Sequence, residues 1–117
     1  MILQDIINII ESVAPLNYQE NWDNSGLQVG NRNAKVNEAL LTVDVTESVV
    51  NEAIDLGCNL IISHHPLLFR GIKHLTGATP QERCVEKAIR HNIAIYSAHT
   101  SMDAYLHGVS GRIAEKL

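Results

Sequence analysis

Three short apolar runs, separated by segments with helical spacing, most strongly constrain the fold of this chain. The runs occupy residues 38–44, 58–62 and 93–97, and each has the length and composition of a buried strand. Because a helix-length segment lies between consecutive runs, the strands that they form are expected to be parallel. The sequence therefore predicts an α/β fold with a largely parallel sheet and helical crossovers.

The N-terminal segment predicts an amphipathic helix over residues 2 to 13. Its apolar positions recur every three or four residues and stop before Pro15. These positions are Ile2, Ile6, Ile9, Ile10 and Val13. Residues 15–37 then contain Pro, Gly and Asn at intervals that interrupt any regular pattern, so we expect them to be irregular.

Two later segments carry helix start and stop signals. One helix follows the capping residue Thr46 and ends at Gly57, which can adopt the left-handed conformation. The next begins at Thr79, with Pro80 in its first position and Glu82 completing a capping box, and ends at Asn92. The expected buried faces are Val49, Val50, Ala53 and Ile54 in the first and Cys84, Val85, Ala88 and Ile89 in the second. Residues 108–117 predict a last helix, with Val109, Ile113 and Leu117 at helical spacing.

Length and composition indicate one α/β domain over residues 1–117. The chain is 45% hydrophobic and 19% charged, with a net charge of −4 and no cluster of Lys and Arg, so neither disorder nor a nucleic-acid partner is expected. The sequence contains no secretory signal pattern and no apolar run long enough for a membrane span. Cys58 and Cys84 are expected to be buried, reduced thiols, which fits a cytoplasmic location.

Polar side chains follow the apolar runs where the predicted strands end. Asp44 closes the first run, His64 and His65 follow the second, and His99 and Asp103 follow the third. Ligands of α/β sheets bind at the carboxyl ends of the strands, so these residues occupy the position of a binding site. Imidazole and carboxylate groups together can bind a divalent metal. The sequence therefore predicts a metal site at this edge of the sheet.

The adjacent histidines favour two metal ions over one. Neighbouring side chains in an extended chain point to opposite sides, and Pro66 biases His65 toward an extended conformation. Each histidine could then bind its own ion, with Asp103 bridging the two ions as in two-metal hydrolases. If residues 99–103 form one helical turn, His99 shares a face with Asp103 and is either a ligand or a hydrogen-bond partner of a ligand.

Simpler interpretations remain open for each residue. A His-His pair in a loop can be merely solvated, and an acidic residue before a helix, such as Asp44, is usually a cap or a partner of the helix dipole. The other three histidines, His74, His91 and His107, are expected at the surface.

Three segments resemble the NIF-three-like family, also labelled GTP cyclohydrolase I type II homologues. They are Trp22–Gly30, Ile61–Phe69 and Tyr96–Asp103, and they occur in the same order as in the family. The resemblance implies half of the NIF-three-like fold and a site for two divalent ions (zinc, iron or manganese). It assigns His64, His65 and Asp103 as metal ligands, with His99 beside them.

The resemblance also implies a ring-shaped homo-oligomer, a hexamer in the family, and a chain that is the N-terminal part of a longer protein. The remaining family ligands, a histidine and a glutamate, come from a C-terminal half that this sequence does not contain, so the site is expected to be incomplete.

Two functions follow. The first is a metal-dependent, GTP cyclohydrolase-like hydrolase acting on a small molecule that the sequence does not identify. The second is a non-catalytic metal-binding module that acts through oligomerisation or regulatory protein partners.

Overall fold

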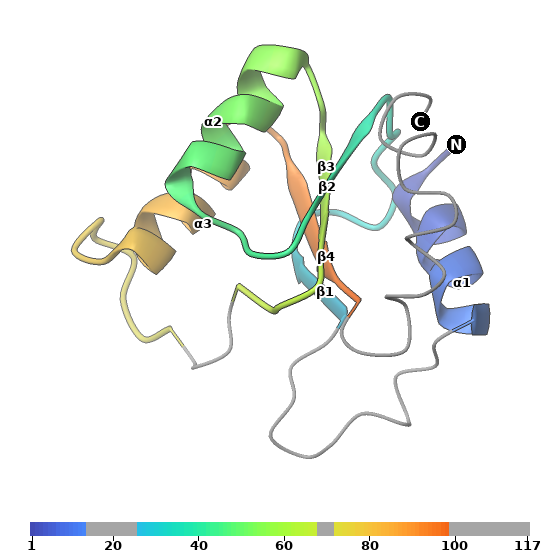
Figure 1. The fold of residues 1–117 in the computed structure, drawn as a ribbon, viewed down its shortest axis with the longest axis horizontal. Helices are drawn as coiled ribbons and strands as arrows, with labels where there is room; N and C mark the ends of the chain where they lie inside the picture. The colour runs from blue at the N-terminus through green and yellow to red at the C-terminus, as the bar shows by residue number, and fades with distance from the viewer. Residues whose placement is uncertain (14–25, 68–71, 99–117) are drawn as a thin grey trace.

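The computed structural model describes residues 1–13, 26–67 and 72–98. This part of the chain forms the helices α1 (Leu3–Val13), α2 (Glu47–Leu56) and α3 (Pro80–Arg90) and the strands β1 (Gly26–Val29), β2 (Ala39–Thr42), β3 (Leu60–Ser63) and β4 (Ala94–Ser97). The sheet lies in the middle of the molecule, with α1 against one face and α2 and α3 against the other (Figure 1).

The four strands form one mixed sheet in the order β1-β4-β3-β2. β2 pairs with β3 and β3 pairs with β4, both in parallel, whereas β1 pairs with β4 in an antiparallel direction. The register places the last residues of the three parallel strands side by side, since Thr42 pairs with Ser63 and Ser63 pairs with Ser97. The predicted α/β class and the parallel pairing of the three predicted strands are thus confirmed.

The expectation that residues 15–37 are irregular is wrong for β1. The strand has only four residues and begins at a glycine, so its sequence is too short for a period-2 pattern to identify it. Pairing with β4 stabilises it instead, and the register shifts between Leu27 and Val29. Because of this irregularity, Leu27 packs on the α1 side of the sheet and Val29 on the α2–α3 side, although residues two positions apart in a regular strand face the same side.

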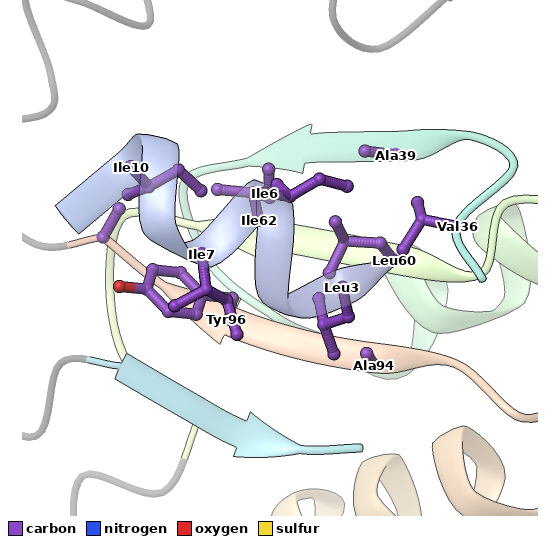
Figure 2. Close-up of a cluster of buried hydrophobic side chains, with 11 residues drawn as sticks. Leu3, Ile6, Ile7, Ile10, Val36, Ala39, Leu60, Ile62, Ala94 and Tyr96 are labelled. Atoms are coloured by element: carbon purple, nitrogen blue, oxygen red, sulfur yellow. The ribbon is translucent and has the colours of Figure 1, made fainter. Parts of the chain in front are cut away.

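The helix α1 covers one face of the sheet through Leu3, Ile6, Ile7 and Ile10, all of which are buried. Figure 2 shows these side chains against Leu60, Ile62, Ala94 and Tyr96 of the two central strands, and Val36 and Ala39 belong to the same cluster. The predicted helix is confirmed, but its predicted face is partly wrong. Ile9 is 47% exposed, and the buried stripe instead has the spacing i, i+3, i+4, i+7 from Leu3.

The helices α2 and α3 cover the opposite face. The buried residues there are Val29, Val50, Ala53, Cys58, Ile61, Cys84, Val85, Ala88, Ile93 and Ile95, with Val49 and Ile54 partly buried against them. The predicted faces of both helices are therefore confirmed except at Ile89, which is exposed. Arg83 of α3 donates through Nε to Glu47 Oε1 of α2 at 2.7 Å and so links the two helices at their N-terminal ends.

The predicted caps Thr46, Gly57 and Thr79 are present, but α3 ends at Arg90 with His91 as its C-cap and so stops before the predicted Asn92. The Glu82 side chain also differs from the predicted capping box in its partners. Thr46 and Thr79 accept from the backbone N–H groups of Val49 and Glu82, and Gly57 is left-handed with φ of 74°. The Glu82 carboxylate accepts from the backbone N–H and the hydroxyl of Thr76 and from the hydroxyl of Thr79. These hydrogen bonds lower the pKa of Glu82, the backbone bond from Thr76 most of all. The carboxylate thus fastens the preceding loop to the helix start.

Candidate metal centre

The His64–His65 pair directly follows the central strand β3. All four residues of β3 are buried, and the chain bends at His64, where the strand ends. The bend is held to the neighbouring β2 segment by two backbone hydrogen bonds, from His64 N to Thr42 O at 3.1 Å and from His65 N to Val43 O at 2.9 Å. The pair therefore has a fixed backbone at the carboxyl edge of the parallel strands, where the sequence predicted it.

Two buried serine hydroxyls also contact this bend. Ser63 Oγ donates to the His65 carbonyl at 2.8 Å, and Ser97 Oγ approaches the His64 carbonyl at a longer 3.5 Å. Both serines are fully buried, and a buried hydroxyl needs a hydrogen-bond partner. The last residues of β3 and β4 thus satisfy their own polar groups by holding the histidine backbone.

The two imidazole rings lie side by side, with centroids 4.8 Å apart and ring planes at 49°. The expectation that they point to opposite sides is wrong because the extended conformation ends at Ser63, before the pair begins. Two imidazoles that bind one tetrahedral ion at about 2 Å have centroids roughly 5 Å apart, and two ions ~3.5–4 Å apart are also within reach of such a pair. The centroid spacing alone therefore does not distinguish one ion from two, and the argument that each histidine needs its own ion no longer follows from the direction of the side chains.

Asp44 lies against His65. Its Oδ1 is 2.6 Å from Nδ1 of His65, and both side chains are at least half exposed. Thr46 is the cap of α2, so the interpretation of Asp44 as a cap is wrong, whereas its interpretation as a partner of the helix dipole stays a prediction. The strand register explains the contact: β2 and β3 are parallel and Thr42 pairs with Ser63, so Asp44 and His65 are each two residues beyond paired strand ends.

The other two predicted site residues, His99 and Asp103, lie outside the described residues, as do His107 and the predicted helix at 108–117. Their place in a metal site stays a prediction. Within residues 1–13, 26–67 and 72–98, no three side chains of His, Cys, Asp or Glu gather in a way that could hold an ion. The described part of the site is therefore the histidine pair with its carboxylate neighbour.

A cavity of about 420 Å³ lies beside the segment that follows the histidines. Pro66 and Leu67 line it together with the N-terminal residues of α2 and of α3. A second cavity, of about 320 Å³, lies near Asn59 and Ala94, where β3 and β4 begin, and is thus at the opposite edge of the sheet from the histidines. Of these two cavities, the first lies at the same edge of the sheet as the histidines, and the lining residue Pro66 directly follows His65 in the chain.

The remaining candidates behave as expected where they are described. Cys58 and Cys84 are buried free thiols. Burial is the main reason that both pKa values are raised, with nearby carboxylates adding to the effect, so neither is a reactive thiolate. His74 and His91 are exposed. None of the described helices has the length and apolar character needed to cross a membrane.

Known proteins are similar to this chain along nearly its whole length. Residues 1–117 match the family described as Duf34/NIF3 (NGG1p interacting factor 3). The "GTP cyclohydrolase 1 type 2 homolog" of Bacillus subtilis is 42% identical over 114 residues, which are 97% of this chain and 31% of that protein. The protein of the same name from Clostridium perfringens is 44% identical over 117 residues, which are 100% of this chain and 45% of that protein.

Solved structures show the same fold. A Bacillus cereus protein related to NIF3 is 43% identical, with a TM-score of 0.81 over 88% of this chain and 28% of that one. Reduced HcgD from Methanocaldococcus jannaschii is 34% identical, with a TM-score of 0.80 over 88% of this chain and 41% of that one. The chain spans less than half the length of these curated relatives and solved structures. With a match along all of its residues, the chain belongs to the Duf34/NIF3 family.

Proposed function

We propose that this chain contributes the N-terminal ligands of a two-ion metal site and acts as a metal-dependent hydrolase. The observation that carries the proposal is the His64–His65 pair, whose rings lie 4.8 Å apart at the carboxyl ends of parallel strands. Imidazole suits zinc and iron, and the donor set therefore fits a divalent transition metal. Asp103 and His99 are the further donors that we assign within this chain.

The residues of the chain have separate roles in this proposal. His64 and His65 hold the metal, and Ser63 and Ser97 keep the backbone of the pair in place through the contacts described above. The cavity beside Pro66 admits the substrate. A divalent ion held by His64 and His65 would supply a Lewis acid and would lower the pKa of a coordinated water. The names of the relatives make GTP the first substrate to test.

The whole site is expected to need more than this chain. Relatives are more than twice as long, and two histidines leave most coordination positions of two ions to other groups. We propose that the missing ligands come from the kind of sequence that the longer relatives have beyond the region matched by this chain. We also propose that the protein forms a ring-shaped homo-oligomer. A cytoplasmic location is part of the proposal, since free thiols persist in a reducing compartment.

A non-catalytic role is the second candidate. One observation favours it: several large apolar side chains are exposed among the described residues. Ile9, Val43, Leu56 and Ile89 are each about half exposed and could contact another subunit or a regulatory protein. In this candidate the metal stabilises an assembly and no reaction follows.

Metal analysis followed by activity assays tests the proposal. The purified chain should bind zinc, iron or manganese, lose that metal in His64→Ala, and retain it in His91→Ala, a matched change at an exposed histidine. Because the remaining ligands are proposed to lie outside this chain, the activity assay uses the longer Clostridium perfringens relative, which should hydrolyse GTP or simple phosphoesters only when it is loaded with metal. Stoichiometric metal without metal-dependent turnover would leave the non-catalytic candidate, and absence of specific metal binding would reject both.

A further inference from the structure

We propose that Asp44 is a positioning residue that holds His65 in the tautomer with its proton on Nδ1, so that Nε2 is the atom presented to a metal. This inference rests on the proposed metal site and gives a role there to Asp44, which lies outside the predicted ligand set. The observation behind it is the 2.6 Å contact between Asp44 Oδ1 and His65 Nδ1.

The chemistry of the two groups decides the tautomer. A carboxylate can only accept hydrogen bonds, so the proton in this contact belongs to Nδ1 of His65. In a neutral imidazole the other nitrogen then carries the lone pair, which is the state that a metal requires. Metal-binding histidines commonly donate their second ring N–H to a carboxylate, which fixes the ring orientation and raises the basicity of the binding nitrogen.

The backbone brings the two side chains together, which makes the contact more than a meeting of two surface groups. Thr42 Oγ1 donates to the Asp44 carbonyl at 2.8 Å and fixes the turn after β2. His65 N donates to the Val43 carbonyl at 2.9 Å and ties the histidine to the same turn. The carboxylate and the ring therefore start from two segments that are already bonded to each other.

The exposure of the pair separates a positioning role from a structural one. The side chains of His65 and Asp44 are 50% and 63% exposed, and ion pairs that are this exposed contribute little to folding stability. Removing Asp44 should therefore leave the fold intact. Its effect should appear in the protonation pattern of the His65 ring and in the affinity for metal.

The first measurement uses the metal-free 117-residue chain. Two-bond proton–nitrogen NMR spectra at about pH 9, well above the usual pKa of histidine, report which nitrogen of each neutral ring carries the proton. We expect His65 to have a protonated Nδ1 and an unprotonated Nε2. In Asp44→Ala the proton should move toward Nε2, which a neutral imidazole favours in water. Asp55→Ala, which removes an exposed carboxylate from α2, should leave the His65 signals unchanged.

The second measurement titrates the same proteins with Zn²⁺ at neutral pH. Asp44→Ala should weaken binding about 10- to 100-fold, the usual effect of losing the partner of a metal-binding histidine, while its thermal unfolding stays close to that of the wild type. Asp55→Ala has the same change in charge and should bind like the wild type.

The outcomes of the two measurements distinguish a wrong role for Asp44 from a wrong metal site. A wild-type His65 with its proton on Nε2, or a tautomer that is unchanged in Asp44→Ala, would overturn the role of Asp44 whatever the zinc titration gives. Equal zinc affinity in Asp44→Ala and wild type would do the same. A chain with the expected tautomer that does not bind zinc specifically would instead reject the metal site on which the inference rests.

Discussion

The two isoleucines Ile7 and Ile9 of α1 offer a sharp test of how this helix packs. Ile7 is fully buried beneath the helix, whereas Ile9, two residues later, is 47% exposed. Both lie in the helix interior, so replacement by alanine changes helix propensity equally at the two positions. Any difference between the two variants in the free energy of unfolding therefore measures packing against the sheet.

The expected difference follows from burial. Ile7→Ala removes three buried carbon atoms at about 0.8 kcal/mol each, or roughly 2.4 kcal/mol, before any cavity is counted. The cavity raises the cost to about 3 kcal/mol, within the ~2–5 kcal/mol that such substitutions show in protein cores. Ile9→Ala should cost about 1 kcal/mol or less, as expected for a side chain open to solvent.

Urea unfolding followed by circular dichroism measures both costs. With an m-value of about 1–3 kcal/mol/M, Ile7→Ala should lower the midpoint by roughly 1–3 M, and Ile9→Ala should lower it by a small fraction of that. Equal costs at the two positions, or a larger cost at Ile9, would refute the packing of α1 described here, because Ile7 would then be no more buried against the sheet than Ile9.

Three further changes test other parts of the structure. Tyr96→Phe removes the hydroxyl that donates to Glu11 Oε2 at 2.9 Å and should destabilise the chain by about 1.5 kcal/mol. A double-mutant cycle with Glu11→Gln measures the coupling of the two side chains, and purely additive effects on the unfolding free energy would contradict the contact. Gly30→Ala places a Cβ 2.7 Å from the Cβ of Ala94, at a backbone φ of +131°. It should therefore cost more unfolding free energy than Gly57→Ala, where no atom lies within 4 Å of the added Cβ and a cost of about 1–2 kcal/mol is expected. Equal costs would show that β1 does not lie against β4 as described. Because the pKa of Glu82 is lower in the folded chain, its hydrogen bonds contribute stability above the ordinary pKa of glutamate and lose it as the pH falls through the folded pKa. Glu82→Gln should therefore be less stable than the wild type at neutral pH, with the gap in unfolding free energy closing in acid; a gap that is independent of pH would argue against these bonds.

Local signals predicted most of the fold because they act over a few residues. Thr46, Gly57 and Thr79 set helix boundaries by satisfying adjacent backbone groups, and the structure has them in these roles. The three parallel strands were equally visible, since buried strands are continuous apolar runs. Strand β1 was missed because its four residues gain their stability from pairing with β4, far along the chain.

In the candidate site, too, the position of the histidines was predicted, whereas the direction of their rings and the contact with Asp44 were not. The edge at which His64 and His65 lie followed from the rule for parallel sheets, but the direction of their rings did not, because it depends on a bend that begins after Ser63. The contact between Asp44 and His65 needed the register of β2 and β3, which spacing along the sequence does not specify. Knowledge of that register would have been enough to pair the two residues.

The coordination of zinc by His64 and His65 is the central claim, and X-ray absorption at the zinc edge of the zinc-loaded chain tests it most directly. We predict imidazole scattering with nitrogen at about 2.0–2.1 Å from zinc, to which His64 and His65 contribute two rings, and a fall of that scattering by two rings in the double variant His64→Ala/His65→Ala. A zinc spectrum without imidazole scattering, or one that the double variant leaves unchanged, would contradict the account.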